Sequence, residues 1–330
     1  MENKFRQESY KKDTRLEAKL QEVNGLLGKV EKELLKDFNE PKFPAVIIVG
    51  APRSGTTLLL QWLAASGNFA YPSNLLSRFY SAPFIGAKIQ KVLADYDTRS
   101  EIFGAEKRFT SLLGKTEGAL NVNEFWYFWR RFFKAKNEGY FTDEELKKAD
   151  VKNFKAELAA IVEEFEKPFA MKGLIFNWNA DYLATQLRGK SIFIHIERNV
   201  FDNAASLLEA RKEFFGDVKR WYSFMIPQFE KLRNENPFFQ VVAQVYLTNE
   251  RIKNTLGKHF EKYYLHVKYE DLCENSANVW EKLREKLSDI EFDLPKREIH
   301  EKFTVKEKNI DDTAMSQFTE ALKRLKNKEF

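Results

Sequence analysis

The chain has 330 residues, 43% of them apolar and 15% aromatic, which is enough to fill the core of one large α/β domain or two smaller ones. Its 54 basic and 49 acidic residues are spread along the sequence, so a nucleic-acid-binding surface is not indicated. A single cysteine, Cys273, excludes an intramolecular disulfide and a cysteine-rich zinc site. We find no apolar stretch of the ~18 to 20 residues that a membrane helix needs and no signal-peptide core, and therefore expect a cytoplasmic protein.

Residues 1–42 are rich in charge and carry apolar residues at helical spacing. The spaced positions are Leu16, Leu20, Val23, Leu27, Val30 and Leu34. We expect a helical N-terminal extension, broken near Gly25 and Gly28, that packs on the main body of the protein. A dimerisation coil is less favoured because the spacing is not sustained for enough heptads. The sequence leaves open whether the chain forms a homo-oligomer.

Residues 43–330 are expected to form a single α/β domain, because predicted strands and helices alternate along them. The run AVIIV at 45–49 is typical of a strand buried on both faces of a parallel sheet. Further strands are predicted at 169–176, 191–198 and 263–269. Residues from about 75 to 166 have a mostly helical pattern and are interpreted as a helical insertion, in which Thr142 and Glu145 form a capping box. The expected fold is a parallel β-sheet flanked by helices.

The first strand runs directly into GAPRSGTT, from Gly50 to Thr57. The glycine spacing is that of a phosphate-binding loop, but Thr56 stands where a nucleoside triphosphatase carries lysine. Backbone N–H groups from Arg53 onward should point into the loop, and the following helix adds its positive end. The side chains of Arg53, Thr56 and Thr57 supply a cation and two hydroxyls. The sequence therefore predicts a site for an oxyanion.

A second anion site is predicted at the end of the third strand. Arg198 closes that strand, and Ser206 lies eight residues further on, about two turns into the next helix. Ligands of parallel sheets bind beyond the C-terminal ends of the strands. Two anion sites at neighbouring strand ends suggest a ligand with phosphate at both ends of a nucleoside.

These motifs resemble those of the sulfotransferases that use 3′-phosphoadenosine 5′-phosphosulfate, PAPS. PRSGTT, at Pro52 to Thr57, matches their 5′-phosphosulfate loop at every position. RNVFDNAAS, at 198–206, matches their 3′-phosphate motif except that Val200 replaces a proline. KYEDLCENS, at 268–276, looks like the end of a strand in many members. The resemblance is specific because the three motifs share the family's order and spacing.

The resemblance implies a P-loop-containing, nucleotide-binding fold of the sulfotransferase type, with PAPS as co-substrate and no required metal. The residues that it assigns to PAPS binding are Arg53, Ser54, Gly55, Thr56, Thr57, Arg198 and Ser206. It also implies in-line transfer of the sulfuryl group to a hydroxyl or amine, releasing 3′-phosphoadenosine 5′-phosphate, PAP. Arg53 and Lys172 are the candidates that stabilise charge on the bridging oxygen, since Lys172 falls where the family has a strand-borne lysine.

The general base cannot be carried over from the family. Cytosolic members have a histidine two residues beyond the lysine, where this chain has Leu174. Tyrosylprotein-type members use a glutamate in a stretch that here reads NFAYPSNL. Glu124 is a candidate because it interrupts an aromatic segment; a base must come within about 3 Å of the acceptor proton. His195 alternates with isoleucines in a buried strand and is predicted to be a hydrogen-bonded core residue.

Neighbouring positions are given structural roles. Core packing is favoured over an acceptor pocket for the aromatic residues at helical spacing, which are Phe125, Phe128, Trp129, Phe132 and Phe133. Arg130 and Arg131 are expected on a solvated face. Asp202 is expected to cap the helix that begins beside it. Residues 302–309 suit equally a surface loop and a segment that closes over the 3′-phosphate.

Two other functions stay open. A P-loop nucleotide kinase or nucleoside triphosphatase is opposed by Thr56 and by the lack of an evident magnesium-binding carboxylate after the second strand. A non-catalytic member that binds PAP or a protein partner is the other alternative, because the base is unassigned. The sequence does not distinguish a phenol, a glycan, a lipid or a peptide hydroxyl as the acceptor.

Overall fold

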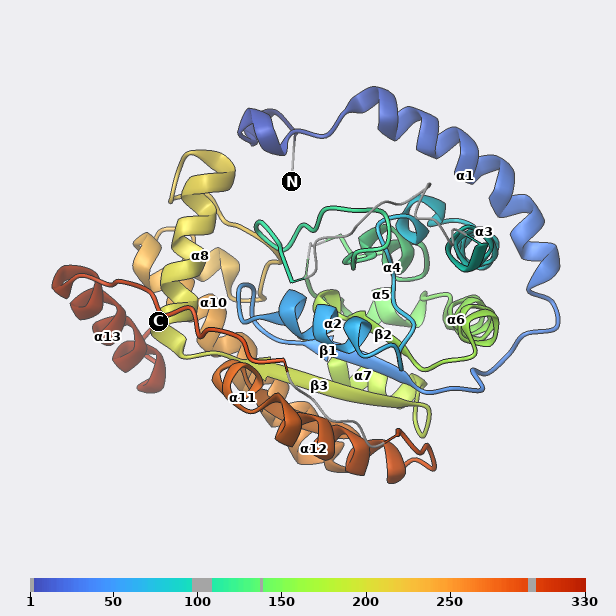
Figure 1. Ribbon diagram of the computed structural model, residues 1–330. Helices are drawn as coiled ribbons and strands as arrows, with labels where there is room; N and C mark the ends of the chain where they lie inside the picture. Colours follow the sequence, from blue (N-terminus) through green and yellow to red (C-terminus); the bar gives the residue numbers. More distant parts are fainter. Residues whose placement is uncertain (1–2, 97–108, 137–138, 296–300) are drawn as a thin grey trace.

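The computed structural model describes residues 3–96, 109–136, 139–295 and 301–330. It contains a parallel four-stranded sheet with the strand order β2-β1-β3-β4. The strands are β1 (Ala45–Val49), β2 (Phe169–Lys172), β3 (Ser191–Glu197) and β4 (Tyr264–Lys268). Helices lie on both sides of this sheet (Figure 1). The predicted α/β architecture with a parallel sheet is confirmed.

The helices follow the strands in the βαβ manner that parallel pairing requires. They are α1 (Thr14–Leu34), α2 (Thr56–Ala65), α3 (Pro83–Tyr96), α4 (Trp126–Phe132), α5 (Asp143–Lys147), α6 (Val151–Phe165), α7 (Ala180–Gln186), α8 (Val200–Phe215), α9 (Phe229–Leu232), α10 (Pro237–Ile252), α11 (Tyr269–Glu274), α12 (Ser276–Ser288) and α13 (Asp312–Lys326). On one face of the sheet, Val46 and Ile48 pack with α2 and α12. On the other, Ile47 packs with α4, α6 and α7.

The register of the parallel sheet brings the carboxyl-terminal ends of three strands close together. Ile48 of β1 pairs with Lys172 on one side and with Ile194 on the other. All residues of β1 are fully buried, as its β-branched composition predicts for a central strand. The glycine loop after β1, Lys172 at the end of β2 and Arg198 after β3 therefore emerge close together.

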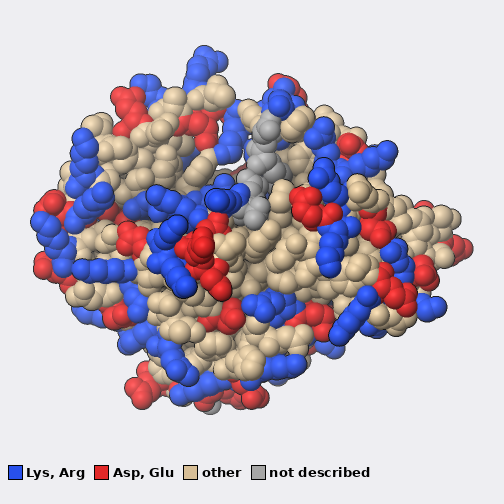
Figure 2. Space-filling model, turned by 180° about the vertical axis from the view of Figure 1, so that it is seen from behind, with Lys and Arg blue, Asp and Glu red and all other residues tan. Residues whose placement is uncertain are grey.

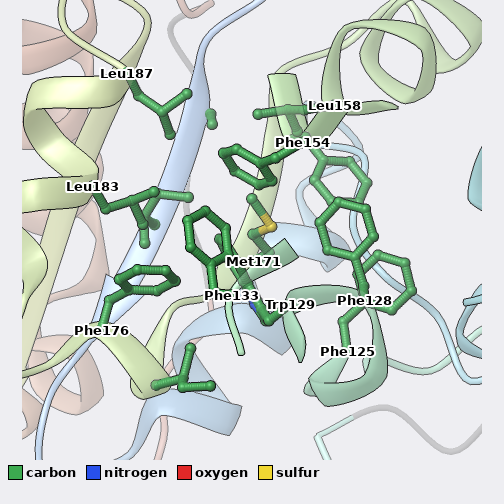
Figure 3. Close-up of a cluster of buried hydrophobic side chains, with 14 of the residues drawn as sticks. Phe125, Phe128, Trp129, Phe133, Phe154, Leu158, Met171, Phe176, Leu183 and Leu187 are labelled. Atoms are coloured by element: carbon green, nitrogen blue, oxygen red, sulfur yellow. The ribbon is translucent and has the colours of Figure 1, made fainter. Parts of the chain in front are cut away.

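A cluster of aromatic side chains fills the space between β2 and the helices beyond it (Figure 3). The five predicted core aromatics are all at most 4% exposed: Phe125, Phe128, Trp129, Phe132 and Phe133. Their packing role is confirmed. The cluster also reaches the edge of the sheet where the strands end, because Trp129 Nε1 donates to the carbonyl of Lys172 at 2.9 Å.

The region from 75 to 166 is less regular than its sequence pattern predicts. Helices α3, α4, α5 and α6 lie in it, but residues 109–125 are irregular, and 97–108 and 137–138 lie outside the described residues. The capping box before α5 is confirmed by bonds between Thr142 and Glu145.

The second strand is shorter than the predicted 169–176. It ends at Lys172, and Leu174–Phe176 form a turn of 3₁₀ helix. Gly173 makes this change possible, since a Cβ there would lie 2.5 Å from Ile47 Cγ2. At this glycine the chain closely approaches the neighbouring strand β1. The sequence gives no sign of this contact, because the glycine lies within an apolar run.

Helix α1 is continuous, so the predicted break near Gly25 and Gly28 is wrong. Gly28 instead allows close approach to the main body, because a Cβ there would lie 3.2 Å from the carbonyl of Ser81. Buried Glu31 accepts N–H groups of Phe84 and Ile85 at the start of α3, at 2.7 and 3.0 Å. The expected packing of the extension on the main body is confirmed, and Figure 1 shows α1 running along the outside of α3.

Basic and acidic side chains are interspersed over the face shown in Figure 2, in keeping with their near balance in the sequence. Exposed side chains of opposite charge also form ion pairs, such as Lys19 with Glu22 at 2.8 Å. Exposed pairs of this kind contribute little to stability. Among the described residues, no helix combines the length and the apolar character that crossing a membrane would demand.

Candidate active site

The glycine loop is anchored at its first residue. Gly50 has φ 151°, and a Cβ there would lie 2.4 Å from the carbonyl oxygen of Ile196, so glycine is required. Its N–H donates to Asn177 Oδ1 at 3.0 Å, and Asn177 Nδ2 donates to the Gly50 carbonyl at 2.8 Å. The buried amide of Asn177 thus fixes where the loop leaves β1.

The rest of the loop turns its backbone toward the start of α2. Arg53 has φ 68° and Gly55 has φ 103°, and a Cβ at Gly55 would lie 2.6 Å from a ring carbon of Tyr269. Gly55 precedes α2 without a side-chain cap, so the first N–H groups of the helix stay available to an anion. The hydroxyl of Ser54 is buried and has no hydrogen-bond partner among the described residues. These features suit the binding of an oxyanion.

The second anion site adjoins the loop. Arg198, only 7% exposed, lies after β3 with its guanidinium 5.0 Å from the ring centre of Tyr269. It donates to the carbonyl of Arg53 at 3.5 Å and to that of Lys306. Arg53 Nε in turn donates to Ser206 Oγ at 3.3 Å. The structure therefore brings together Arg53 from the first predicted motif and Arg198 and Ser206 from the second.

Lys172 and Glu124 meet at the other side of the loop. Lys172, 2% exposed, donates from Nζ to Thr57 Oγ1 at 2.7 Å and lies 3.1 Å from Glu124 Oε1. Glu124 keeps a third of its side chain exposed and accepts from Trp126 Nε1 through its other oxygen. Gly114 covers this pair, because a Cβ there would lie 3.4 Å from Glu124 Oε1. An accessible carboxylate thus stands beside a buried ammonium group.

This arrangement has the parts that transfer of an anionic group requires. The loop and two arginines can hold negative charge, a lysine can stabilise a leaving group, and a carboxylate can accept a proton. Among the residues that the structure describes, no three His, Cys, Asp or Glu side chains gather in a way that could hold a metal ion.

His195 is confirmed as a core residue. It is fully buried, with its ring nitrogens 2.9 Å from Tyr264 Oη and 3.1 Å from Asn249 Oδ1. Burial lowers its pKa to about 3, with smaller effects from its neighbours. The imidazole is therefore neutral and committed to structural hydrogen bonds.

Asp202 does not cap α8. Asn199 does, since its Oδ1 accepts the N–H groups of Phe201 and Asp202 at 3.0 and 3.3 Å. The carboxylate of Asp202 instead accepts the N–H of Lys308 at 2.7 Å. Together with the bond from Arg198 to Lys306, this holds the segment 302–309 against the second anion site.

Arg131 was expected on a solvated face and is instead paired. It forms a bidentate ion pair with Glu157, at 2.8 and 2.5 Å, and the Glu157 side chain is only 4% exposed. Glu157 lies on α6, which packs against α4. The pattern of charges along α4 alone cannot reveal a partner on another helix. Arg130 lies over the ring of Trp126, 5.5 Å from its centre.

Three residues near the site were missed from the sequence. Asn177 follows the predicted second strand directly, which was the available signal. Tyr222 donates to the carbonyl of Leu113 at 3.3 Å, and burial of its hydroxyl together with the nearby Glu124 raises its pKa. Tyr10, whose hydroxyl donates to Glu213 at 2.6 Å, comes from the N-terminal extension. The last two are brought in by tertiary packing, which leaves no local pattern.

Comparison with known proteins was made at the levels of family, sequence and structure. Residues 44–293 match the model of the sulfotransferase family. A search of curated protein sequences finds no significant match. The chain is similar to sulfotransferase STF9 from Mycobacterium avium, with 11% identity and a TM-score of 0.51 over 94% of this chain and 76% of that one. It is also similar to sulfotransferase STF1 from Mycobacterium tuberculosis H37Rv, with 12% identity and a TM-score of 0.47 over 90% of this chain and 75% of that one.

The likeness to STF9, at such low identity, concerns the fold, and the predicted P-loop-containing sulfotransferase fold is confirmed. The family model extends from just before β1 to beyond α12 and so includes the glycine loop, Lys172, Arg198 and Ser206. On this evidence the chain belongs to the sulfotransferase family.

Proposed function

We propose that the protein transfers a sulfuryl group from PAPS to a hydroxyl or amine of an acceptor and releases PAP. Membership of the sulfotransferase family supports the reaction class. The observation that carries the choice of donor is the contact between the two anion sites, in which Arg53 Nε donates to Ser206 Oγ at 3.3 Å. Sites joined in this way suit one nucleotide that has a phosphate at each end.

In this proposal the 5′-phosphosulfate lies in the glycine loop. The backbone of Ser54, Gly55, Thr56 and Thr57 and the side chain of Arg53 bind it. The unpartnered hydroxyl of Ser54 supports this role, since a buried polar group without a partner is costly until a ligand satisfies it. Arg198 and Ser206 bind the 3′-phosphate, with the segment 302–309 beside them.

The transfer is an in-line displacement at sulfur. The acceptor oxygen or nitrogen forms a bond to sulfur while the bond from sulfur to the bridging oxygen breaks, and that electron pair stays on the phosphate of PAP. Lys172 and Arg53 stabilise the charge on the bridging oxygen. Glu124 accepts the proton of the acceptor, a role supported by the one third of its side chain that is exposed and by the distance of 3.1 Å between its Oε1 and Lys172 Nζ.

The nucleoside triphosphatase alternative is disfavoured by the surroundings of Thr57. In that class the hydroxyl at the end of the loop binds magnesium. Here Thr57 Oγ1 accepts a hydrogen bond from Lys172 Nζ at 2.7 Å, so an ammonium group already occupies the place of a cation. A donor without a γ-phosphate fits this arrangement better.

Thermal unfolding with PAP, ADP and ATP, each with and without magnesium, tests the donor. PAP at a hundred times its Kd should stabilise by about 2.7 kcal/mol without metal. Arg198→Ala should abolish this stabilisation, whereas Arg188→Ala, exposed at the opposite edge of the sheet, should preserve it. Stabilisation by ATP with magnesium alone would contradict the proposal and favour a kinase.

Turnover of PAPS in a panel of acceptors tests catalysis. Lys172→Ala should lower kcat by about 10² to 10³-fold, as expected when one group that stabilises developing charge is removed. PAP should still stabilise the variant, because the phosphate contacts of the loop and of Arg198 remain. Equal turnover by the variant and the wild type would exclude Lys172 from the reaction.

A further inference from the structure

A cavity of about 320 Å³ is lined in part by Asn123 and Phe125, the chain neighbours of Glu124. The N-terminal extension forms one wall, and residues on both sides of Glu124 form another. Trp126 connects the two places, because it lines the cavity and donates to Glu124 Oε2. A volume of this order accommodates a small-molecule ligand.

The acidic side chains that line the cavity are already engaged. Asp13 Oδ1 accepts two N–H groups at the start of α1, from Arg15 and Leu16. Glu17 lies 3.1 Å from Lys12 Nζ and accepts from Tyr127 Oη at 2.5 Å. Both carboxylates therefore already have close partners, and Glu17 also lies within electrostatic reach of Arg78.

Two basic side chains that line the same cavity lack such partners. Within the described part of the chain, Arg78 and Lys115 form no ion pair, and their side chains make no hydrogen bond. The ammonium of Lys115 stands 5.2 Å from the ring centre of Tyr10. Burial, with the charges of Arg6 and Lys12, lowers its pKa, and the nearby Glu124 acts in the opposite sense. The cavity thus has an excess of positive charge close to the proposed base.

The walls between these charges are largely aromatic and aliphatic. Tyr80 and Tyr127 pack with ring centres 5.0 Å apart, and Leu16 and Leu20 of α1 line the same cavity. The wall from α1 and Tyr10 lies outside the segment that matches the family model, 44–293. This part of the cavity is therefore a feature of the N-terminal extension of this chain.

We propose that this cavity binds the sulfuryl acceptor and selects one that carries an anionic group, held by Lys115 and Arg78 while its hydroxyl reaches Glu124. The inference rests on the proposed function and narrows its acceptor to small, anionic hydroxyl compounds with an apolar body. The N-terminal extension contributes to their recognition.

The test uses the full chain saturated with PAP and titrated calorimetrically with 4-hydroxybenzoate and with its neutral counterpart 4-hydroxybenzamide. The acid should bind at least about tenfold more tightly, a difference of about 1.4 kcal/mol. Lys115→Met and Arg78→Met should each reduce this preference several-fold, and Lys115→Arg should restore it. Lys19→Met is the matched control, since Lys19 on α1 is 78% exposed and paired with Glu22.

Equal binding of the two compounds, including no binding of either, would overturn the inference. A preference for the acid that persists in both Lys115→Met and Arg78→Met would overturn it as well. The affinity for PAP, measured in the same series, separates the two proposals. Absence of PAP binding counts against the proposed function, whereas intact PAP binding without preference for the acid counts against the acceptor inference alone.

Discussion

The proposed donor end of the site, formed by the glycine loop, Arg198 and Ser206, differs from the proposed acceptor end, formed by Glu124, Lys115 and Tyr10, in the contacts that hold it in place. The donor end is fixed by backbone at the edge of a buried sheet, with Asn177 and Asn203 bonded to the carbonyls of Gly50 and Pro52. The acceptor end consists of irregular chain and the N-terminal extension. In the proposed function, the fold thus fixes how the donor is bound, while segments that the sheet does not constrain select the acceptor.

The largest expected effect is the loss of turnover on substitution of Glu124, which should alter the proposed acceptor end and leave the proposed donor end intact. Glu124→Gln keeps the size of the side chain and removes the proton acceptor, so kcat should fall by about 10² to 10⁴-fold. Stabilisation by PAP should be unchanged, because the donor end is intact. The control is Glu117→Gln, an exposed position in the same irregular segment. Wild-type turnover in Glu124→Gln would remove Glu124 as the base.

The rigidity of the donor end is tested at Gly50. Gly50→Ala would place a Cβ 2.4 Å from the carbonyl of Ile196 at a φ that alanine rarely adopts, and should cost about 3 kcal/mol of unfolding free energy. Gly25→Ala, in α1 with nothing within 4 Å, should instead stabilise by about 0.5 to 1 kcal/mol. Urea unfolding measures both. A neutral Gly50→Ala would contradict the close approach.

The sheet beneath the donor end should respond to acid through His195. In the unfolded chain its pKa is about 6.5, and in the native state burial lowers the pKa to about 3. Below pH 6.5 the unfolded state therefore binds a proton at His195 that the native state does not, so the contribution of His195 to stability falls as the pH drops from about 6.5 toward 3. At pH 5 the loss is about 2 kcal/mol.

Urea unfolding at pH 7.5 and pH 5 in the wild type and in His195→Asn measures this contribution. The variant should lose about 2 kcal/mol less than the wild type between the two pH values. Burial alone would raise the pKa of the neighbouring Glu197, but hydrogen bonds from His266 and Lys253 lower it to about 2. Glu197 therefore titrates mostly below this window. The same pH dependence in both proteins would show that His195 is not responsible.

The smallest expected effect is at Ser206. Ser206→Ala removes a hydrogen bond to Arg53 Nε and a proposed contact to the 3′-phosphate, and should weaken PAP binding by about 0.5 to 1.5 kcal/mol. Discrimination between 4-hydroxybenzoate and 4-hydroxybenzamide should be unaffected. A changed preference for the acid would mean that the two ends are coupled, and the comparison would then have to be revised.

The same contrast explains how much could be predicted from the sequence. The parallel sheet and the order of its strands with the helices follow from local patterns of apolar residues and glycines, and they were predicted correctly. The donor residues were found because a loop between a strand and a helix is a short, contiguous motif. Their roles in binding, and those of Lys172 and Glu124 in catalysis, stay predictions that the proposed variants test.

What was missed depends on contacts between distant parts of the chain. Tyr10 is held by Glu213 and Phe214 near the end of α8, and the partner of Arg131 lies on another helix. In the sequence, Gly28 suggests a break in a helix and Gly173 gives no signal within an apolar run. In the structure, each glycine marks a place where the backbone closely approaches a neighbouring segment. The cap of α8 was assigned to Asp202 rather than Asn199 because the start of the helix was placed slightly late.

The hydrogen bond from the indole of Trp129 to the carbonyl of Lys172 ties the proposed catalytic lysine to the aromatic interior. The backbone of Lys172 is thereby held against the closely packed aromatic cluster. The position of its ammonium group therefore depends on the packing of that cluster. Loss of volume deep in the interior, at a residue such as Phe128, would therefore be transmitted to the lysine as lost alignment, far from any surface that a substrate touches.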